Sequence, residues 1–185
     1  MYPILETEHL ILRKWQLMDL DDLYEYAKNP CVGSMAGWKP HESKEEAFNV
    51  IKYYIENDYR WALVLKESGK VIGTVNIKPD NNRGKYYAKL LSFALSADFW
   101  GKGYMTEAVK CVVKYVFEEM GVDILTAFHY PHNMRSKRVI EKCGFKYEGT
   151  IEQGSKTYDG QVFDSIFYSI IKSDYYNFYN ALKGE

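Results

Sequence analysis

The segment LLSFALSADFWGKGYMT, residues 90–106, decides the fold of this chain. Its apolar start predicts a strand from Lys89 to Leu95, and a loop containing Gly101 and Gly103 leads from that strand directly into a helix. Glycine has no Cβ, so the loop backbone can turn tightly and come close to a ligand. The first amides of a helix lack partners inside the helix and lie at the positive end of its dipole. The segment therefore predicts a strand–loop–helix unit suited to an anion such as a pyrophosphate, with Lys102 adding charge.

Two common phosphate-binding motifs do not describe this loop. The pattern GxxxxGK[ST] is absent, and after Gly101-Lys102-Gly103 the third glycine of a GxGxxG motif is replaced by Thr106. Glycine-containing turns between a strand and a helix also occur for structural reasons alone. The loop by itself therefore leaves the ligand open.

A second segment, YPHNMRSKRVIEKCGF, covers residues 130–145. A strand from Ile124 to Tyr130 ends there, and Asn133 is typical of a residue that caps the start of a helix. We expect a short helix from Met134 to Cys143, ended by Gly144. Ser136 lies one turn into this helix. Both Asn133 and Ser136 are open to a purely structural interpretation, as a cap and a water-facing hydroxyl.

The rest of the chain alternates between helical and strand patterns, which predicts an α/β (α+β) domain with a mixed sheet. The other expected strands are Leu10–Arg13, the hairpin Trp61–Leu65 and Val71–Ile77, and the pair Phe145–Ile151 and Val162–Ile171 around an Asp159-Gly160 turn. Four other helices are expected. The first begins at Asp19 and ends at Asn29-Pro30, the second runs from a Ser43 cap to about Asn57, and the last two cover Tyr104–Met120 and Asp174–Leu182. The segment Gly33–Pro40 is expected to be a loop.

Length, charge and composition narrow the class of protein. The 185 residues fit a single domain, 1–185, and the net charge of -1 gives no indication of a nucleic-acid partner. Three widely spaced cysteines and four histidines form no disulfide or metal-binding pattern, so we expect no metal and a reduced chain. Charged residues interrupt every apolar run near the N-terminus, which predicts neither a signal peptide nor a membrane span. A cytoplasmic protein is the simplest interpretation.

The two segments together resemble the GNAT acetyltransferase superfamily. That superfamily has a phosphate loop of Gln or Arg, two residues, Gly, one residue, and Gly or Ala; Gly103 matches it, whereas Trp100 and Met105 depart from it. The string WGKGYMTEA is similar to the branch of ribosomal-protein-alanine N-acetyltransferases. The strings LETEHLILR, GWKPH, NMRSKRVIEKCGF, GTIEQG and DGQVFDSIFYS are similar to that branch as well, so the resemblance runs nearly end to end.

The resemblance implies a specific sheet. It is a mixed, mostly antiparallel, seven-stranded sheet with helices on both faces and a V-shaped split between the fourth and fifth strands. In this sequence those strands are Lys89–Leu95 and Ile124–Tyr130. A strand that parts from its neighbour leaves backbone groups unpaired, and the amides of a pantetheine arm can bond to them.

The resemblance also implies acetyl-CoA as co-substrate and a set of residues that bind it. Asn133 would bond to the pantetheine arm, and Ser136 would lie close to the sulfur. The other implied cofactor-binding residues are Phe93, Ala94 and Leu95 for the pantetheine, and Trp100, Gly101, Lys102, Gly103, Tyr104, Met105 and Thr106 for the pyrophosphate.

The implied reaction is direct attack of a neutral amine on the thioester, with the amide near Leu95 holding the carbonyl oxygen. Many members use a tyrosine, seven residues after the asparagine, to protonate the leaving thiolate. Ile140 occupies that position here, so the resemblance assigns Ser136 as the catalytic proton donor. A merely positional role for Ser136 is the alternative.

The resemblance says less about the general base and the acceptor than about the cofactor contacts. A glutamate that serves as base in this branch corresponds to Ser155, and Glu152 and Asp159 are expected to be solvated turn residues, so a water chain is an alternative.

Trp38 and Tyr158 are the candidate acceptor contacts, or else packing aromatics. The acceptor is expected to be a protein or peptide N-terminal α-amine; a small amine such as a polyamine, an antibiotic or an amino-acid derivative, and a non-catalytic CoA-binding module, are the alternatives. A homodimer stays open.

Overall fold

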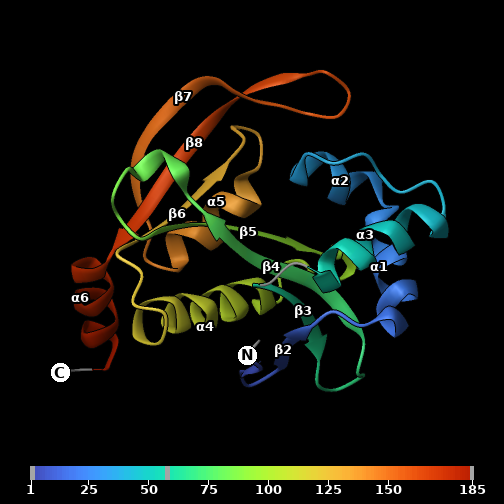
Figure 1. Cartoon of the computed structure of the whole chain (residues 1–185), viewed down its shortest axis with the longest axis horizontal. Helices are drawn as coiled ribbons and strands as arrows, with labels where there is room; N and C mark the ends of the chain where they lie inside the picture. Colours follow the sequence, from blue (N-terminus) through green and yellow to red (C-terminus); the bar gives the residue numbers. More distant parts are fainter. Residues whose placement is uncertain (1–2, 57–58, 184–185) are drawn as a thin grey trace.

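The computed structural model describes residues 3–56 and 59–183, which contain an eight-stranded sheet in the order β1-β2-β3-β4-β5-β6-β8-β7 (Figure 1). Every neighbouring pair is antiparallel except β5 and β6, which run parallel. The strands are β1 (Leu5–Glu6), β2 (Leu10–Lys14), β3 (Arg60–Leu65), β4 (Val71–Pro79), β5 (Ala88–Leu95), β6 (Ile124–His129), β7 (Lys146–Lys156) and β8 (Val162–Ile171). The helices are α1 (Leu20–Ala27), α2 (Pro30–Ala36), α3 (Lys44–Glu56), α4 (Tyr104–Glu118), α5 (Met134–Lys142) and α6 (Lys172–Lys183).

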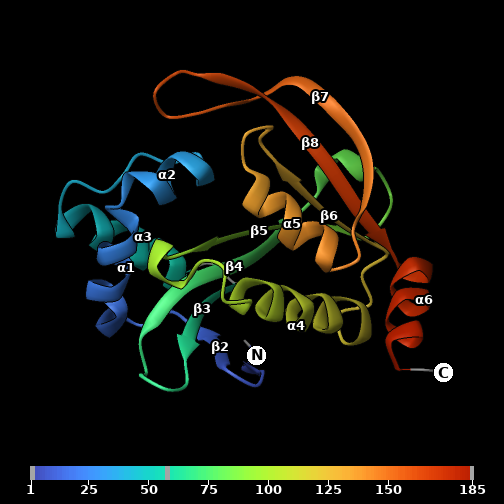
Figure 2. The same cartoon turned by 180° about the vertical axis from the view of Figure 1, so that it is seen from behind.

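Helices cover both faces of the sheet (Figure 2). On one face, α4 packs its apolar stripe against the strands, and Val109, Val112 and Val116 in that stripe are fully buried. Helix α5 packs on this face too, through Ile140. Helices α1, α2 and α3 form a second cluster on the opposite face, where Leu23 and Ile51 are buried. The expected mixed, mostly antiparallel fold with helices on both faces is confirmed.

The expected split between the two central strands is present. Strand β5 pairs with β6 only from Ala88 to Leu90, opposite Ile124 to Thr126. On its other side, β5 stays paired with β4 as far as Leu95. The second half of β5 therefore has a neighbour on one side only, and the wedge between β5 and β6 opens toward their C-terminal ends.

The sheet differs from the expectation by one strand. Residues Leu5–Glu6 form a two-residue edge strand that pairs with Leu12 and Ile11 of β2. Two residues are too few to show the alternation by which a strand is recognised in a sequence.

A second correction concerns the segment Gly33–Pro40, because a helix, α2, occupies its first part. Asn29 caps this helix by accepting a hydrogen bond from the Cys31 amide at 2.9 Å, and Pro30 is its first residue. Asparagine followed by proline therefore ends α1 and begins α2, and proline is favoured at that first position because its missing amide would be unpaired anyway. Gly37 ends α2 with φ +82°. The expected end of α3 near Asn57 lies outside the described residues.

A buried polar contact fixes the place where β5 and β6 are still paired. Thr126 is fully buried on β6, and its hydroxyl lies 2.7 Å from Asp80 Oδ2 and 3.2 Å from the Lys89 carbonyl oxygen. Asp80 also accepts a bond from the Asn82 amide at 3.1 Å and lies near Arg83. The loop before β5 and the paired half of β6 are thereby held together at the closed end of the split.

We predict that Thr126→Val destabilises the protein by about 2 kcal/mol, because it keeps the side-chain shape but removes a donor to a buried carboxylate. The free energy of unfolding is measured in urea, with Thr126→Ser as the matched control that keeps the hydroxyl. Equal midpoints for the wild type and the valine variant would show that this hydroxyl contributes nothing.

Candidate functional site

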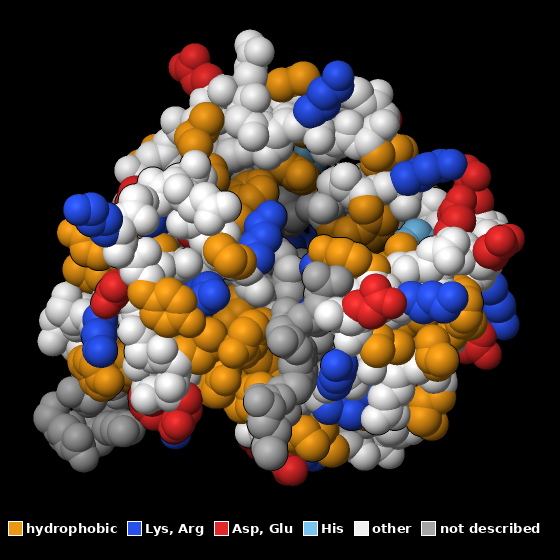
Figure 3. Space-filling model, viewed as in Figure 1, with side chains coloured by type: hydrophobic (Ala, Val, Ile, Leu, Met, Phe, Trp, Pro, Cys, Tyr) orange, Lys and Arg blue, Asp and Glu red, His pale blue; other side chains and the backbone are white. Residues whose placement is uncertain are grey.

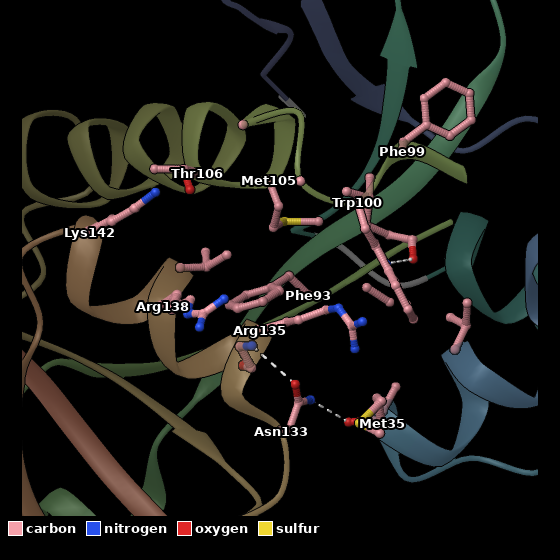
Figure 4. Close-up of a pocket in the computed structure, with 18 residues that line it drawn as sticks. Met35, Phe93, Phe99, Trp100, Met105, Thr106, Asn133, Arg135, Arg138 and Lys142 are labelled. Atoms are coloured by element: carbon pink, nitrogen blue, oxygen red, sulfur yellow. Dashed lines mark hydrogen bonds between the residues drawn. The ribbon is translucent and has the colours of Figure 1, made fainter. Parts of the chain in front are cut away.

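A cavity of about 380 Å³ lies beside the parted half of β5 (Figure 4). Strand β5, the loop that follows it and the start of α4 form one wall, α5 forms another, and α2 closes an end. Most of the expected cofactor-binding residues line it together, although they come from separate parts of the chain. They are Phe93, Ala94, Leu95, Trp100, Gly101, Gly103, Met105, Thr106, Asn133 and Ser136.

The glycine loop presents free amides to this cavity. Gly101 and Gly103 adopt φ angles of +79° and +89°, which favour glycine, and open space surrounds the position of a Cβ on each. Within the part of the chain that the structure describes, no group accepts a hydrogen bond from the amides of residues 101–106. The first bond of α4 is donated by Glu107 to the Gly103 carbonyl at 3.0 Å. Unpaired amides at a helix start are what a diphosphate requires, so these residues fit the phosphates of CoA.

The backbone of β5 alternates between its two sides. The Ser96 amide donates to the Ile72 carbonyl of β4 at 2.8 Å, so residues an even number of positions away, such as Ala94, also direct their backbone groups toward β4. Phe93 and Leu95 then direct theirs into the split. The Leu95 carbonyl accepts a bond from Trp100 Nε1 at 2.9 Å, which leaves the Leu95 amide and the Phe93 groups for a pantetheine arm.

Asn133 is the cap of α5, and it also ties α5 to α2. Its side-chain oxygen accepts from the Ser136 amide at 3.1 Å, and its nitrogen donates to the Met35 carbonyl at 2.9 Å (Figure 4). Ser136 is half-buried, and no described residue bonds to its hydroxyl. The cap therefore sets the position of Ser136 while its hydroxyl stays available to a ligand.

Three basic side chains on α5 were not anticipated as site residues. Arg135, Arg138 and Lys142 line the cavity, and none of them forms an ion pair with a described carboxylate. Their spacing of three and four residues places them along one side of the helix. The Arg135 guanidinium stacks over the Trp100 ring at 4.4 Å from its centroid. The spacing was readable in the sequence, but only the position of α5 shows that this side faces the glycine loop.

A second cavity, of about 300 Å³, opens on the opposite face of the sheet. Thr74, Asn76 and Lys78 of β4 line it, and they alternate with Val75 and Ile77, which pack toward α4. The two cavities share Ala36, Phe93, Ala94, Asn133 and Ser136. The split in the sheet therefore connects a cavity on one face with a cavity on the other, and Ser136 lies where they meet. In the space-filling view this side of the molecule is hollowed between the β7–β8 hairpin and α2 (Figure 3).

Several candidate residues lie elsewhere. Lys102 and Tyr104 do not line the cavity: the Lys102 ammonium lies over the Phe99 ring and Tyr104 packs against His9. Trp38 lines the second cavity, whereas Tyr158 is half exposed in the β7–β8 hairpin and lines neither.

None of the other positions considered for the acid or the base lines either cavity. Ile140, at the position where related enzymes carry tyrosine, is fully buried. Asp159 accepts a bond from the Thr157 hydroxyl at 2.6 Å, and this bond lowers the pKa of the Asp159 carboxyl. Glu152 is exposed and lines neither cavity. Among the hydroxyl residues that sequence analysis put forward, Ser136 lines both cavities, whereas Thr106 lines the first alone.

The described residues contain neither a membrane-spanning helix nor a cluster of metal ligands. No helix there is both long enough and apolar enough to span a bilayer. No group of three or more histidine, cysteine or acidic side chains in those ranges is arranged to bind a metal ion. Cys31, Cys111 and Cys143 are free, and burial raises the pKa of the Cys143 thiol to about 12, so this cysteine is a packing residue.

The fold and the paired cavities are those of an acyl-CoA-dependent transferase, and comparison with known proteins identifies the class. The family model described as acetyltransferase (GNAT) domain matches residues 9–146. The chain belongs to this family and is an acetyl-CoA-dependent N-acetyltransferase.

Relatives of known sequence agree with this class, and a solved structure shares the fold. The uncharacterized N-acetyltransferase YoaA of Bacillus subtilis is 28% identical over 93% of this chain and 98% of its own. The [ribosomal protein uS5]-alanine N-acetyltransferase of Escherichia coli is 28% identical over 57% of this chain and 54% of its own. Spermidine N-acetyltransferase from Vibrio cholerae, solved with CoA and spermine, has a TM-score of 0.76 at 20% identity and covers 91% of this chain and 99% of its own.

We predict that Gly103→Val weakens CoA binding by about tenfold or more, a loss of ~1.4 kcal/mol or more, because the branched side chain fills the space in front of the unpaired amides. Affinity is measured by titration calorimetry. Gly69→Val is the matched control: Gly69 also has a positive φ, +72°, and open space around its Cβ position, but it lies in the β3–β4 turn. Equal CoA affinities for the two variants would exclude the loop as the phosphate site.

Proposed function

We propose that the protein transfers the acetyl group of acetyl-CoA directly to the α-amine of a protein or peptide N-terminus. The observation that carries this proposal is the junction of the two cavities at Ser136, Phe93 and Ala94. Each substrate then has its own cavity on its own face of the sheet, and the reacting groups meet in the split. Such an arrangement supports transfer without a covalent enzyme intermediate.

The first cavity supplies the cofactor contacts in this proposal. The amides of residues 101–106 bind the diphosphate, and Arg135, Arg138 and Lys142 add positive charge beside it. Backbone groups of Phe93 and Leu95 bond to the pantetheine arm in the manner of an added strand. Asn133 contributes through the second hydrogen of its side-chain amide, since its other polar bonds are made to α2 and α5.

Two groups of the chain act in the chemical step. Acetyl-CoA supplies an activated thioester. The Leu95 amide, directed into the split, donates to the carbonyl oxygen as that oxygen gains negative charge. The Ser136 hydroxyl gives a proton to the departing sulfur, whose thiol has an ordinary pKa of about 8.5.

The chemistry of the site favours an α-amine over a lysine side chain. No described residue that lines either cavity is an aspartate or a glutamate, so the acceptor has to lose its proton without a carboxylate base there. An α-amine with a pKa near ~8 is roughly one-tenth neutral at pH 7, whereas a lysine amine with a pKa near ~10.4 is far less so. A site without a carboxylate base is therefore better matched to an N-terminus.

We predict that Ser136→Ala lowers kcat by about a hundredfold and leaves the Kd for CoA within about twofold, because it removes a proton donor but keeps the amide that Asn133 caps. Single-turnover acetyl transfer and calorimetric CoA binding measure the two quantities. Ser173→Ala, an exposed serine on α6, is the control. Transfer at the wild-type rate would remove Ser136 from the chemical step.

We also predict that peptides with a free N-terminus and no lysine are acetylated, and that N-terminally blocked peptides containing lysine are not. Mass spectrometry of both sets locates the acetyl group. With the accepted peptides, kcat/KM is expected to rise about tenfold per pH unit below pH ~8, since only the neutral amine reacts. Acetylation confined to lysine or to small amines would overturn the assignment of the acceptor.

A further inference from the structure

The second cavity has an unusual charge, and this charge bears on which amines it accepts. Its charged lining residues among those described are Arg60 on β3 and Lys78 on β4, both basic. Neither forms an ion pair with a carboxylate of the described residues. The overall charge of the chain is -1, so this positive pair is a local feature and does not follow from a basic composition.

Arg60 is held in place by contacts that leave its charge uncompensated. Its guanidinium lies over the Tyr54 ring at 4.3 Å and near the Tyr53 ring at 5.8 Å. With the Asn76 amide oriented to satisfy both of its ends, the Asn76 oxygen accepts from Arg60 Nη2 at 3.2 Å. Neutral partners fix the orientation of the Arg60 guanidinium, and its positive charge is not neutralised by them. This arrangement is expected for a group that binds a carboxylate.

The neighbouring polar groups are consistent with an anion in this cavity. Asn76 is 6% exposed on a strand whose neighbours are apolar, and its side chain contacts the Ser92 hydroxyl. The Trp38 indole nitrogen is buried and has no partner among the described residues. Trp38, Asn76 and Ser92 all line the cavity. The Ser92 hydroxyl and the Trp38 indole thus accompany the two cations as groups able to donate a hydrogen bond.

We propose that the acceptor carries a carboxylate close to its α-amine, and that Arg60, assisted by Lys78, binds this carboxylate while the amine faces Ser136. Within the proposed α-amine specificity, on which this inference rests, the preferred acceptors are peptides whose first or second residue is acidic, or free acidic amino acids. Polyamines carry the opposite charge and are repelled by the same pair. Like charges in one cavity cost binding free energy, and no described lining residue offers them a carboxylate.

The test uses acceptors matched in shape and different in charge. Peptide amides beginning with Glu are compared with those beginning with Gln. Free glutamate is compared with glutamine amide, which keeps the α-amine but has no carboxylate, and spermidine serves as the cation. The wild type is expected to show kcat/KM about tenfold or more higher for the Glu peptide than for the Gln peptide, consistent with a charge-assisted bond. Arg60→Gln is expected to abolish this preference without changing the KM for acetyl-CoA, because Arg60 does not line the first cavity, and Arg60→Lys is expected to restore part of it.

Controls separate this inference from the proposed function. Lys114→Gln removes one positive charge from α4, outside both cavities, and is expected to keep the preference. Binding of the two peptides to the CoA-loaded protein is measured by calorimetry, so the charge preference is read even where transfer is slow. Equal binding of the Glu and Gln peptides, or tighter binding of spermidine, overturns the inference. Acetylation of α-amines without charge preference overturns it while leaving the α-amine assignment intact.

The experiments with free amino acids decide whether the carboxylate belongs to a small molecule or to a protein N-terminus. If glutamate is acetylated as efficiently as the Glu peptide, the acceptor is a small molecule whose own carboxylates meet Arg60. If only the peptide is accepted, the acidic side chain belongs to a protein N-terminus. Both results support an anionic acceptor, and they assign it to different substrates.

Discussion

Strands β5 and β6 begin as parallel neighbours and then part, and the whole site depends on that parting. Buried backbone groups without partners cost about 1–3 kcal/mol each, so an open wedge in the middle of a sheet needs local compensation. The structure supplies it at both ends. The Thr126 hydroxyl joins β6 to Asp80 and Lys89 at the closed end, and the Trp100 indole satisfies the Leu95 carbonyl at the open end. The groups left over between these points are those that a pantetheine arm fits.

Helix α5 turns this opening into a junction between two cavities. Asn133 caps the helix and bonds to the Met35 carbonyl at the end of α2, so elements from opposite faces of the sheet meet at one side chain. The same cap places Ser136 in the lining of both cavities. A residue with an ordinary structural role thus determines where the candidate proton donor lies. The structural role of Asn133 is compatible with the proposed functional one, because its bonds to α2 and α5 leave the second hydrogen of its side-chain amide over.

The sequence predicted the elements that depend on local patterns and missed what depends on distant contacts. The strand, glycine loop and helix from Lys89 to Met120 follow from apolar periodicity and positive φ at glycine, and they lie where expected. Helix α2 was missed because its signal is a single Asn29-Pro30 pair rather than a periodic stripe. The basic side of α5 and the cavity around Arg60 were missed because charge spacing on one element does not say which surface it faces. Tyr158, put forward from the resemblance, does not line either cavity and stays an untested candidate.

The positive charge of the second cavity also bears on the absence of a carboxylate base among its described lining residues. A cation near a bound amine disfavours the protonated form of that amine, and so lowers its pKa. Arg60 and Lys78 line the cavity in which the acceptor would lie, and no described carboxylate lines it to oppose them. The pair that binds an anionic group on the acceptor would then also increase the fraction of neutral amine at pH 7. A carboxylate base would do the reverse before it accepted the proton, because its negative charge stabilises an ammonium ion. The two basic residues and the lack of a carboxylate in the second cavity therefore fit one proposal, in which the site selects an amine that is already easy to deprotonate and lowers its pKa further.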